Sequence, residues 1–326
     1  MPPAFRPFLL ALSAAFLLSG TALGIGFRSS AQVVVASGVR LRDFEGKGRD
    51  TALRALTQQL YARYRDEADF LLLVANRTTI PASTPDLGYH FRVANTVAGL
   101  GVPKFNAGAN FGQTNTLQGI LYFPRWTLFW RSPLLHELAH GWANDALPTA
   151  ERGHFGFCGA GSQLGGFDTR TLKALGGGLY QAKNRAGRPF GTATNGNDVP
   201  YSDFELYLMG LLPANEVRPF ACAVGASWVS PAQGIFRAQQ MQTLTIADVQ
   251  RRLGPRLPDA RTAPKTFRVL AVLLSEGEPT LAQVRGAERA VTQIAVQDNH
   301  DSTYTFFEAT RGRGRLLLLR PKLLEK

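Results

Sequence analysis

The chain has 326 residues, of which 45% are hydrophobic, 18% are charged and 10% are aromatic. This composition is enough for one large domain or two closely packed lobes, and it is not that of a disordered chain. The formal net charge is +12, but the Lys and Arg residues are scattered and no basic run is interleaved with aromatic residues. We therefore expect no nucleic-acid partner, and we interpret the charge as a solubility or cell-surface property.

The N-terminal segment, residues 1–24, is typical of a secretory signal peptide. Arg6 supplies a positive start, residues 8–18 are almost all apolar, and Ala22 and Gly24 are the small residues expected before the cleavage site. An uncleaved anchor is the alternative, because the apolar segment is nearly long enough to span a bilayer. No later segment could cross a membrane. The sequence therefore predicts a secreted or periplasmic protein, with no stable membrane span once the signal is removed.

Short apolar runs predict strands, and apolar residues at helical spacing predict helices. In chain order these are a strand at residues 32–36, a helix at 50–64, strands at 70–75, 89–93 and 120–123, a helix at 133–146, loops and short strands over 151–199, helices at 204–212 and 246–253, a strand at 267–274 and a helix at 281–295. The continuous apolar run at 70–75 is the pattern of a buried central strand.

The helix expected at residues 133–146 carries the most informative motif. Ser132 is a suitable N-cap and Pro133 a suitable first helical residue, and an HExxH motif extends from His136 to His140. Residues four apart share a helix face, so both imidazoles can point at one ion. The alternative is an amphipathic helix with two surface histidines.

The motif predicts zinc chemistry. Zinc suits two neutral imidazoles plus a carboxylate or a third histidine, and a fourth position then remains for water. Glu137 follows the first ligand and can take a proton from the metal-bound water, which then attacks a carbonyl. We therefore expect a Zn²⁺-dependent hydrolase, in which His136 and His140 bind the metal and Glu137 activates the water.

HExxH on such a helix resembles the active-site helix of the zincin metallopeptidases. The string from Tyr201 to Gly210 also resembles a block downstream of HExxH in secreted bacterial metallopeptidase-like proteins, so the resemblance covers mainly residues 120–210. It implies an α+β fold with a twisted mixed sheet, and an edge strand beside the cleft, for which residues 120–123 are the candidate. The metzincin pattern is not matched, because Ala143 and Ala146 occupy its later positions.

The third metal ligand has several candidates. Glu205 is the first choice, because glutamate-ligand zincins place their third ligand in a downstream helical segment; an exposed helix carboxylate is its other interpretation. His154 could instead complete a three-histidine site, hydrogen-bond the oxyanion on the substrate, or be an ordinary loop residue. Asp203 and Asp168 are lower candidates, as ligands or as groups that orient an imidazole.

The two cysteines, Cys158 and Cys222, fit an exported protein. An even count favours one disulfide, and two buried free thiols are the alternative. Neither lies in a CxxC arrangement, so a thiolate zinc site is not expected.

These observations predict a zincin-like catalytic region at residues 25–215, followed by a second, mixed α/β C-terminal lobe at residues 216–326. We expect a zinc metallopeptidase that cleaves peptide or protein substrates, cell-wall peptides included. The alternative is a non-catalytic cell-envelope or surface binding protein with a structural metal or none.

Overall fold

A computed structural model describes residues 25–82, 84, 87–112, 115–127, 132–147, 153–191, 197–298 and 303–325. The expected signal peptide lies outside these residues. Among the helices that are described, none combines the length and the apolar character needed to cross a membrane.

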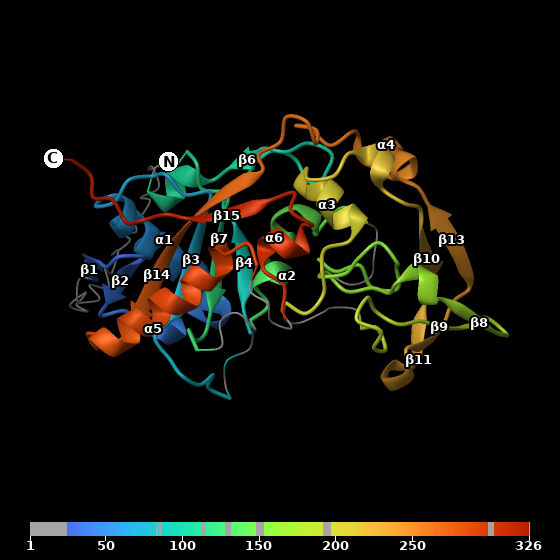
Figure 1. Cartoon of the computed structure of the whole chain (residues 1–326), viewed down its shortest axis with the longest axis horizontal. Coiled ribbons are helices and arrows are strands. Elements are labelled where there is room, and N and C mark those ends of the chain that lie inside the picture. Colours follow the sequence, from blue (N-terminus) through green and yellow to red (C-terminus); the bar gives the residue numbers. More distant parts are fainter. Residues whose placement is uncertain are drawn as a thin grey trace, which may run out of the picture.

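The described residues form a mixed sheet of seven strands in the order β1-β2-β14-β3-β7-β4, with β15 also paired to β14 (Figure 1). The strands are β1 (Gly26–Ser29), β2 (Val33–Ser37), β3 (Phe70–Ala75), β4 (Tyr89–Arg92), β7 (Gly119–Phe123), β14 (Thr266–Ser275) and β15 (Arg315–Leu318). The inner strands and β15 run parallel, and β1 and β4 are antiparallel to their neighbours. The chain is therefore an α+β protein built on a mixed sheet.

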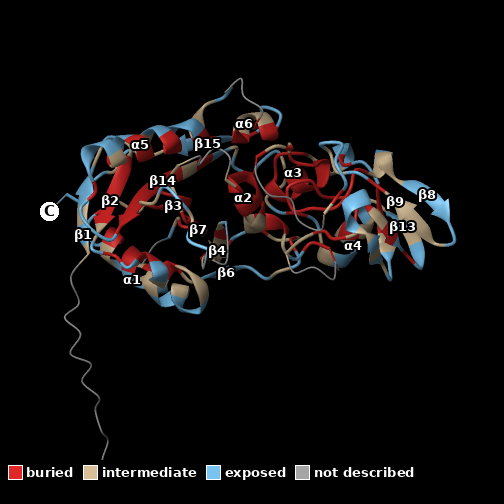
Figure 2. Cartoon of the chain, turned by 90° about the horizontal axis from the view of Figure 1, so that it is seen from below, coloured by how far each residue is buried: buried red, intermediate tan, exposed pale blue. Residues whose placement is uncertain are grey.

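The inner strands of this sheet (β2, β14, β3 and β7) are buried on both faces, which is why they are almost continuously apolar. Along β3, Phe70, Leu72 and Val74 belong to one core, whereas Leu71 and Leu73 belong to the other. The second core is covered by α1 (Arg49–Tyr61), and the first by helices that include α2 (Leu134–Ala143), α5 (Leu281–Thr292) and α6 (Phe306–Ala309). Figure 2 shows the buried sheet between α1 on one side and α5 and α6 on the other.

Two expectations about the sheet need correction. The strand expected at the edge, residues 120–123, lies in β7, which pairs with both β3 and β4; the edge beside it is β4. The sheet also crosses the boundary expected after residue 215, because β14 lies between β2 and β3. At ten residues, β14 is long enough to pair with β15 through its first half and with β2 through its second half. Residues 266–275 and 315–318 of the expected C-terminal lobe are thus part of the main sheet, so the segment after residue 215 does not form one separate lobe.

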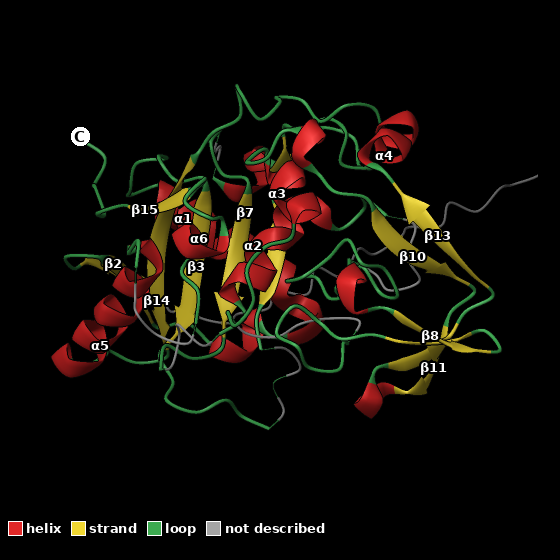
Figure 3. Cartoon of the chain, turned by 45° about the vertical axis from the view of Figure 1, so that its right-hand side comes forward, coloured by secondary structure: helices red, strands yellow, loops and turns green. Residues whose placement is uncertain are grey.

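A second group of strands lies at the far end of the molecule from the main sheet (Figure 3). A four-stranded sheet has the order β11-β12-β9-β8, and β10 pairs with β13. These strands are β8 (Lys173–Gly176), β9 (Leu179–Gln181), β10 (Phe220–Val224), β11 (Ser227–Ser230), β12 (Ile235–Arg237) and β13 (Gln240–Leu244). A separate short pair is formed by β5 (Ala94–Asn95) and β6 (Phe105–Asn106). Phe167, Phe190 and Phe236 form an aromatic core at this end. Helix α3 (Asp203–Met209) packs against α2, and α4 (Ile246–Leu253) precedes β14.

Candidate metal centre

Helix α2 carries the HExxH motif and is enclosed by the protein. It packs against β4, β7 and α3, and His136 and Glu137 are only 5% and 6% exposed. The helix begins at Leu134, and Pro133, without a side-chain bond, occupies the N-cap position in place of Ser132. The first turn is instead bonded by a distant segment: the Leu135 N–H donates to Asn197 Oδ1 at 3.0 Å, and the Tyr201 hydroxyl donates to the Leu135 carbonyl at 2.8 Å.

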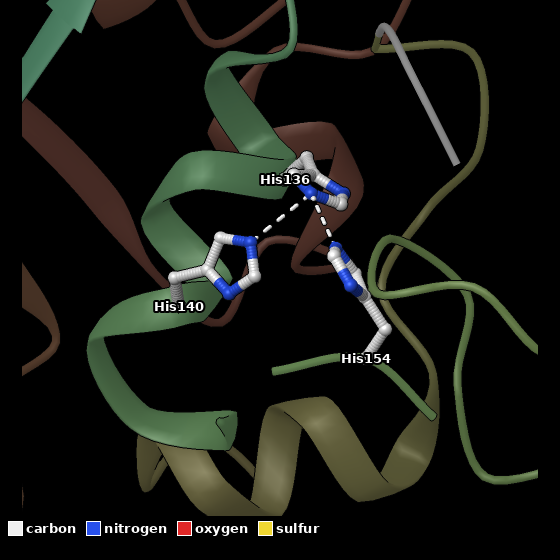
Figure 4. Close-up of side chains that lie close together, drawn as sticks. All are labelled: His136, His140 and His154. Carbon is white, nitrogen blue, oxygen red and sulfur yellow. Dashed lines mark hydrogen bonds between the residues drawn. The ribbon is translucent and has the colours of Figure 1, made fainter. Parts of the chain in front are cut away.

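The structure brings together three imidazoles (Figure 4). His136 and His140 project from α2, and His154 approaches them from the loop that follows. The Nε2 atom of His136 lies 3.1 Å from Nε2 of His140 and 3.2 Å from Nε2 of His154. One nitrogen of each of the three residues lies within 4.8 Å of the others. This group could therefore hold a metal ion.

The hydrogen bonds at the Nδ1 atoms help to determine whether the Nε2 atoms, which face one another, carry a hydrogen or a lone pair. His136 Nδ1 lies 2.6 Å from the Gln163 carbonyl oxygen, and a carbonyl can only accept, so His136 Nδ1 carries the hydrogen. His140 Nδ1 is paired in the same way with Asn144 Oδ1. Burial lowers the pKa of His140 to about 4, against the effect of the Asn144 hydrogen bond, so this imidazole is neutral at pH 7. His140 Nε2 then presents a lone pair, and His136 Nε2 presents one when its ring is neutral. Two such lone pairs repel at the distance of 3.1 Å unless a cation or a proton lies between them.

The spacing also suits a tetrahedral ion. Ligand nitrogens at about 2.0–2.1 Å from a tetrahedral zinc ion are separated from one another by about 3.3–3.4 Å. The two contacts of His136 Nε2, at 3.1 and 3.2 Å, are close to this value. Three imidazole ligands would leave a fourth tetrahedral position for water or substrate.

His154 is held in place by the residues around it. Phe155 is 1% exposed, donates its N–H to the Leu164 carbonyl at 2.8 Å, and packs on Phe204. Gly153 has a φ of +71°, and a Cβ there would lie 3.3 Å from Cε1 of His140. A glycine thus permits this backbone conformation and the close approach of the loop to α2.

Glu205, the first choice for the third ligand, lies outside the histidine group. Its side chain is fully buried, and Oε1 accepts the backbone N–H groups of Ser162 at 3.2 Å and Leu164 at 2.9 Å. Oε2 accepts the N–H of Ser202 at 2.7 Å, in a capping box that begins α3. Burial raises the pKa of Glu205, and these backbone hydrogen bonds oppose that rise. The structure therefore places the other candidate, His154, beside the two motif histidines, and Glu205 at the start of a helix.

The two aspartate candidates are bound elsewhere. Asp203 accepts hydrogen bonds from Arg218 and Arg311, both at 2.6 Å. Asp168 caps a short 3₁₀ helix and is paired with Arg170. Burial alone would raise the pKa of each aspartate, but the arginine hydrogen bonds outweigh it and lower both pKa values. Neither carboxylate belongs to the histidine group.

His90 is a residue of the site region that the motif did not identify. Its Nδ1 lies 2.7 Å from the carbonyl oxygen of Glu137, so this histidine on β4 bonds the backbone of α2. Although the residue is partly exposed, its Nε2 is buried, and a Cβ on Gly119 would lie 2.2 Å from that atom. Burial lowers the pKa of His90 to about 3, so the ring is neutral. The sequence signal for this contact is the pair Gly119 and Gly141, because a Cβ on Gly141 would also lie close to the ring, 3.1 Å from Cε1 of His90.

The disulfide between Cys158 and Cys222 confirms the expected pairing. It joins the loop that follows His154 to β10. The adjacent Gly159 N–H donates to the Ala221 carbonyl at 2.7 Å, which reinforces the same connection.

No family model matches the chain, and comparisons with curated proteins and with solved structures found no significant match. The interpretation of the site therefore depends on its own geometry. That geometry provides three convergent imidazoles, of which His136 and His140 have their outer Nδ1 atoms hydrogen-bonded. A buried carboxylate, Glu137, is next to the first of them in sequence.

Proposed function

We propose that this protein is a zinc-dependent hydrolase, of zincin-like fold, that cleaves peptide bonds. His136, His140 and His154 would hold the ion, and Glu137 would act as the general base. The observation that carries the proposal is the convergence of three imidazole nitrogens from α2 and the following loop. A set of three imidazoles with a position left for water is a common catalytic zinc arrangement.

Each residue would have a defined task. Zinc, when bound, would lower the pKa of a water molecule and polarise the scissile carbonyl. Glu137 would accept a proton from the attacking water and pass it to the leaving amine. Gln163 and Asn144, through the Nδ1 atoms of His136 and His140, would keep both rings in the ligand tautomer. Because His154 would serve as a ligand, the oxyanion would need a different donor.

The arrangement of β4 supports a peptide as substrate. β4 is the terminal strand of the main sheet in the described residues, is antiparallel to β7, and packs against α2. An extended peptide could add to such an edge through main-chain hydrogen bonds. We therefore assign to β4 the substrate-binding part that the sequence suggested for residues 120–123.

The proposed location is secreted or periplasmic. The disulfide between Cys158 and Cys222 supports this, because disulfides persist mainly in oxidising compartments. The pattern of residues 1–24 supports it independently.

Replacement of the proposed base tests the function. Glu137→Gln should bind zinc but lose hydrolysis of a pool of fluorogenic peptides by about 100-fold or more, the contribution of a general base. Glu276→Gln, which changes an exposed carboxylate far from α2 in sequence, is the control and should retain full activity. Equal activity of Glu137→Gln and the wild type would exclude this mechanism. Zinc binding without hydrolysis in the wild type would favour a structural metal in a binding protein.

A further inference from the structure

Glu205 and His136 contact opposite sides of one peptide unit. Glu205 Oε1 accepts the Leu164 N–H at 2.9 Å, and the carbonyl of that same peptide, which belongs to Gln163, accepts the Nδ1 hydrogen of His136 at 2.6 Å. A trans peptide is planar, with its N–H and C=O groups pointing in opposite directions. Fixing the N–H on one side therefore fixes the direction of the C=O on the other.

The segment around this peptide is bonded to the chain that leads into α3. The Ser162 N–H also donates to Glu205 Oε1, and the Ser162 hydroxyl donates to the Pro200 carbonyl at 2.6 Å. The side-chain amide of Gln163 donates to the Val199 carbonyl at 2.6 Å. Glu205 itself is placed by the Ser202 capping box. These bonds leave the Gln163 carbonyl little freedom to rotate away from His136.

We propose that Glu205 is a positioning residue of the metal site, which acts on His136 through the Gln163–Leu164 peptide. Carboxylate groups are common outer partners of metal-binding histidines, where they fix the tautomer and raise ligand basicity. Here a peptide unit lies between the carboxylate and the imidazole. The negative charge of Glu205 would polarise that peptide and make its carbonyl a stronger acceptor, because hydrogen bonds in a chain strengthen one another. This inference rests on the proposed function, since it requires the histidines to bind zinc.

The same capping arrangement elsewhere in the chain provides a matched control. Glu308 accepts the N–H of Thr305 at 2.7 Å in the capping box of α6, the same distance as between Glu205 and Ser202. No peptide that contacts a metal-site histidine is bonded to Glu308 in the described residues. Glu308→Gln thus reproduces the loss of a capping carboxylate without the effect on His136.

The experiment compares zinc affinity, by competition with a chromophoric chelator, and the visible spectrum of the Co²⁺-substituted protein. Glu205→Gln keeps one acceptor oxygen but loses the charge and the second acceptor. Its zinc Kd should rise by about 10–100-fold, the usual cost of losing an outer partner, with an altered Co²⁺ spectrum. Glu308→Gln should match the wild type in both. A folded Glu205→Gln protein with wild-type affinity and spectrum would overturn the proposal.

A second variant covers the case in which Glu205→Gln does not fold. Gln163→Ala keeps the peptide and Glu205 but removes the bond to Val199, and it should raise the zinc Kd in the same direction by a smaller factor. In that case an unchanged Kd for Gln163→Ala would overturn the proposal. These measurements need no hydrolysis assay. A wild-type protein that binds no zinc would contradict the proposed function. Variants of Glu205 and Gln163 that bind zinc with wild-type affinity would contradict the positioning role alone.

Discussion

Asn144 lies one helical turn after His140 on the chain, and its side-chain oxygen accepts the Nδ1 hydrogen of that histidine. The Gln163 carbonyl makes the equivalent bond to His136. One outer partner is a side chain of the same helical segment and the other is a main-chain group from a distant loop. Together they turn both Nε2 atoms of the motif toward a common point.

The Asn144 contact should contribute to metal affinity. Asn144→Leu keeps the approximate shape of the side chain but removes the acceptor, so we expect the zinc Kd to rise by about 10–100-fold. Asn144→Asp retains an acceptor and should bind zinc at least as tightly as the wild type. Chelator competition measures all three proteins, and a Leu variant with wild-type affinity would show that this bond does not orient His140.

The identity of the third ligand can be tested by substitution. His154→Ala removes one of three imidazoles, and because structural zinc sites bind with about 10–16 kcal/mol shared among their ligands, the Kd should rise roughly 100-fold or more. Asp168→Asn, at one of the other candidates, should leave the Kd unchanged. The opposite pattern, with zinc retained by His154→Ala and lost by Asp168→Asn, would reverse the assignment.

His90 should make stability depend on pH. The pKa of His90 is about 3 in the folded protein but about 6.5 in the unfolded chain. Below pH 6.5 the unfolded chain therefore binds a proton that the folded protein excludes. The free energy of unfolding falls as the pH is lowered. Between pH 7 and pH 5 this histidine alone should remove about 2 kcal/mol. His90→Gln keeps a donor for the Glu137 carbonyl and does not titrate. Urea unfolding in the presence of a chelator, at both pH values, should show the wild type losing more stability than the variant; equal losses would show that His90 is not buried as a neutral ring.

The disulfide should stabilise the loop that carries His154. Cys158 and Cys222 are 64 residues apart, and closing a loop of that length in the unfolded chain corresponds to about 4 kcal/mol. Cys222→Ser paired with Cys158→Ser should therefore lower the unfolding free energy and the thermal midpoint. Under reducing conditions the wild type should approach the double variant, and a wild type that is insensitive to reduction would indicate little contribution from the bond.

Local patterns predicted several elements well. The strand at residues 70–75 and the helix at residues 246–253 have the bounds that the sequence indicated, because a continuous apolar run and a capped helical period each specify structure within one segment. The HExxH spacing likewise placed two imidazoles on one face of α2, since that spacing depends only on the helical repeat.

Features that depend on distant segments were not predicted. The run at residues 267–274 indicates a strand, but nothing local shows that it lies between β2 and β3. The cap of α2 comes from Asn197 and not from the adjacent Ser132, because the buried helix start is bonded by the segment packed on it. The choice between Glu205 and His154 depended in the same way on which loop returns to α2.

The most direct test of the account is a zinc K-edge X-ray absorption spectrum of the purified protein loaded with one equivalent of zinc. A zinc ion held by His136, His140 and His154 should show a four-coordinate first shell of nitrogen and oxygen at about 2.0–2.1 Å, with outer-shell scattering from three imidazoles. Zinc that remains in solution, or that is bound with no more than one imidazole, would contradict it.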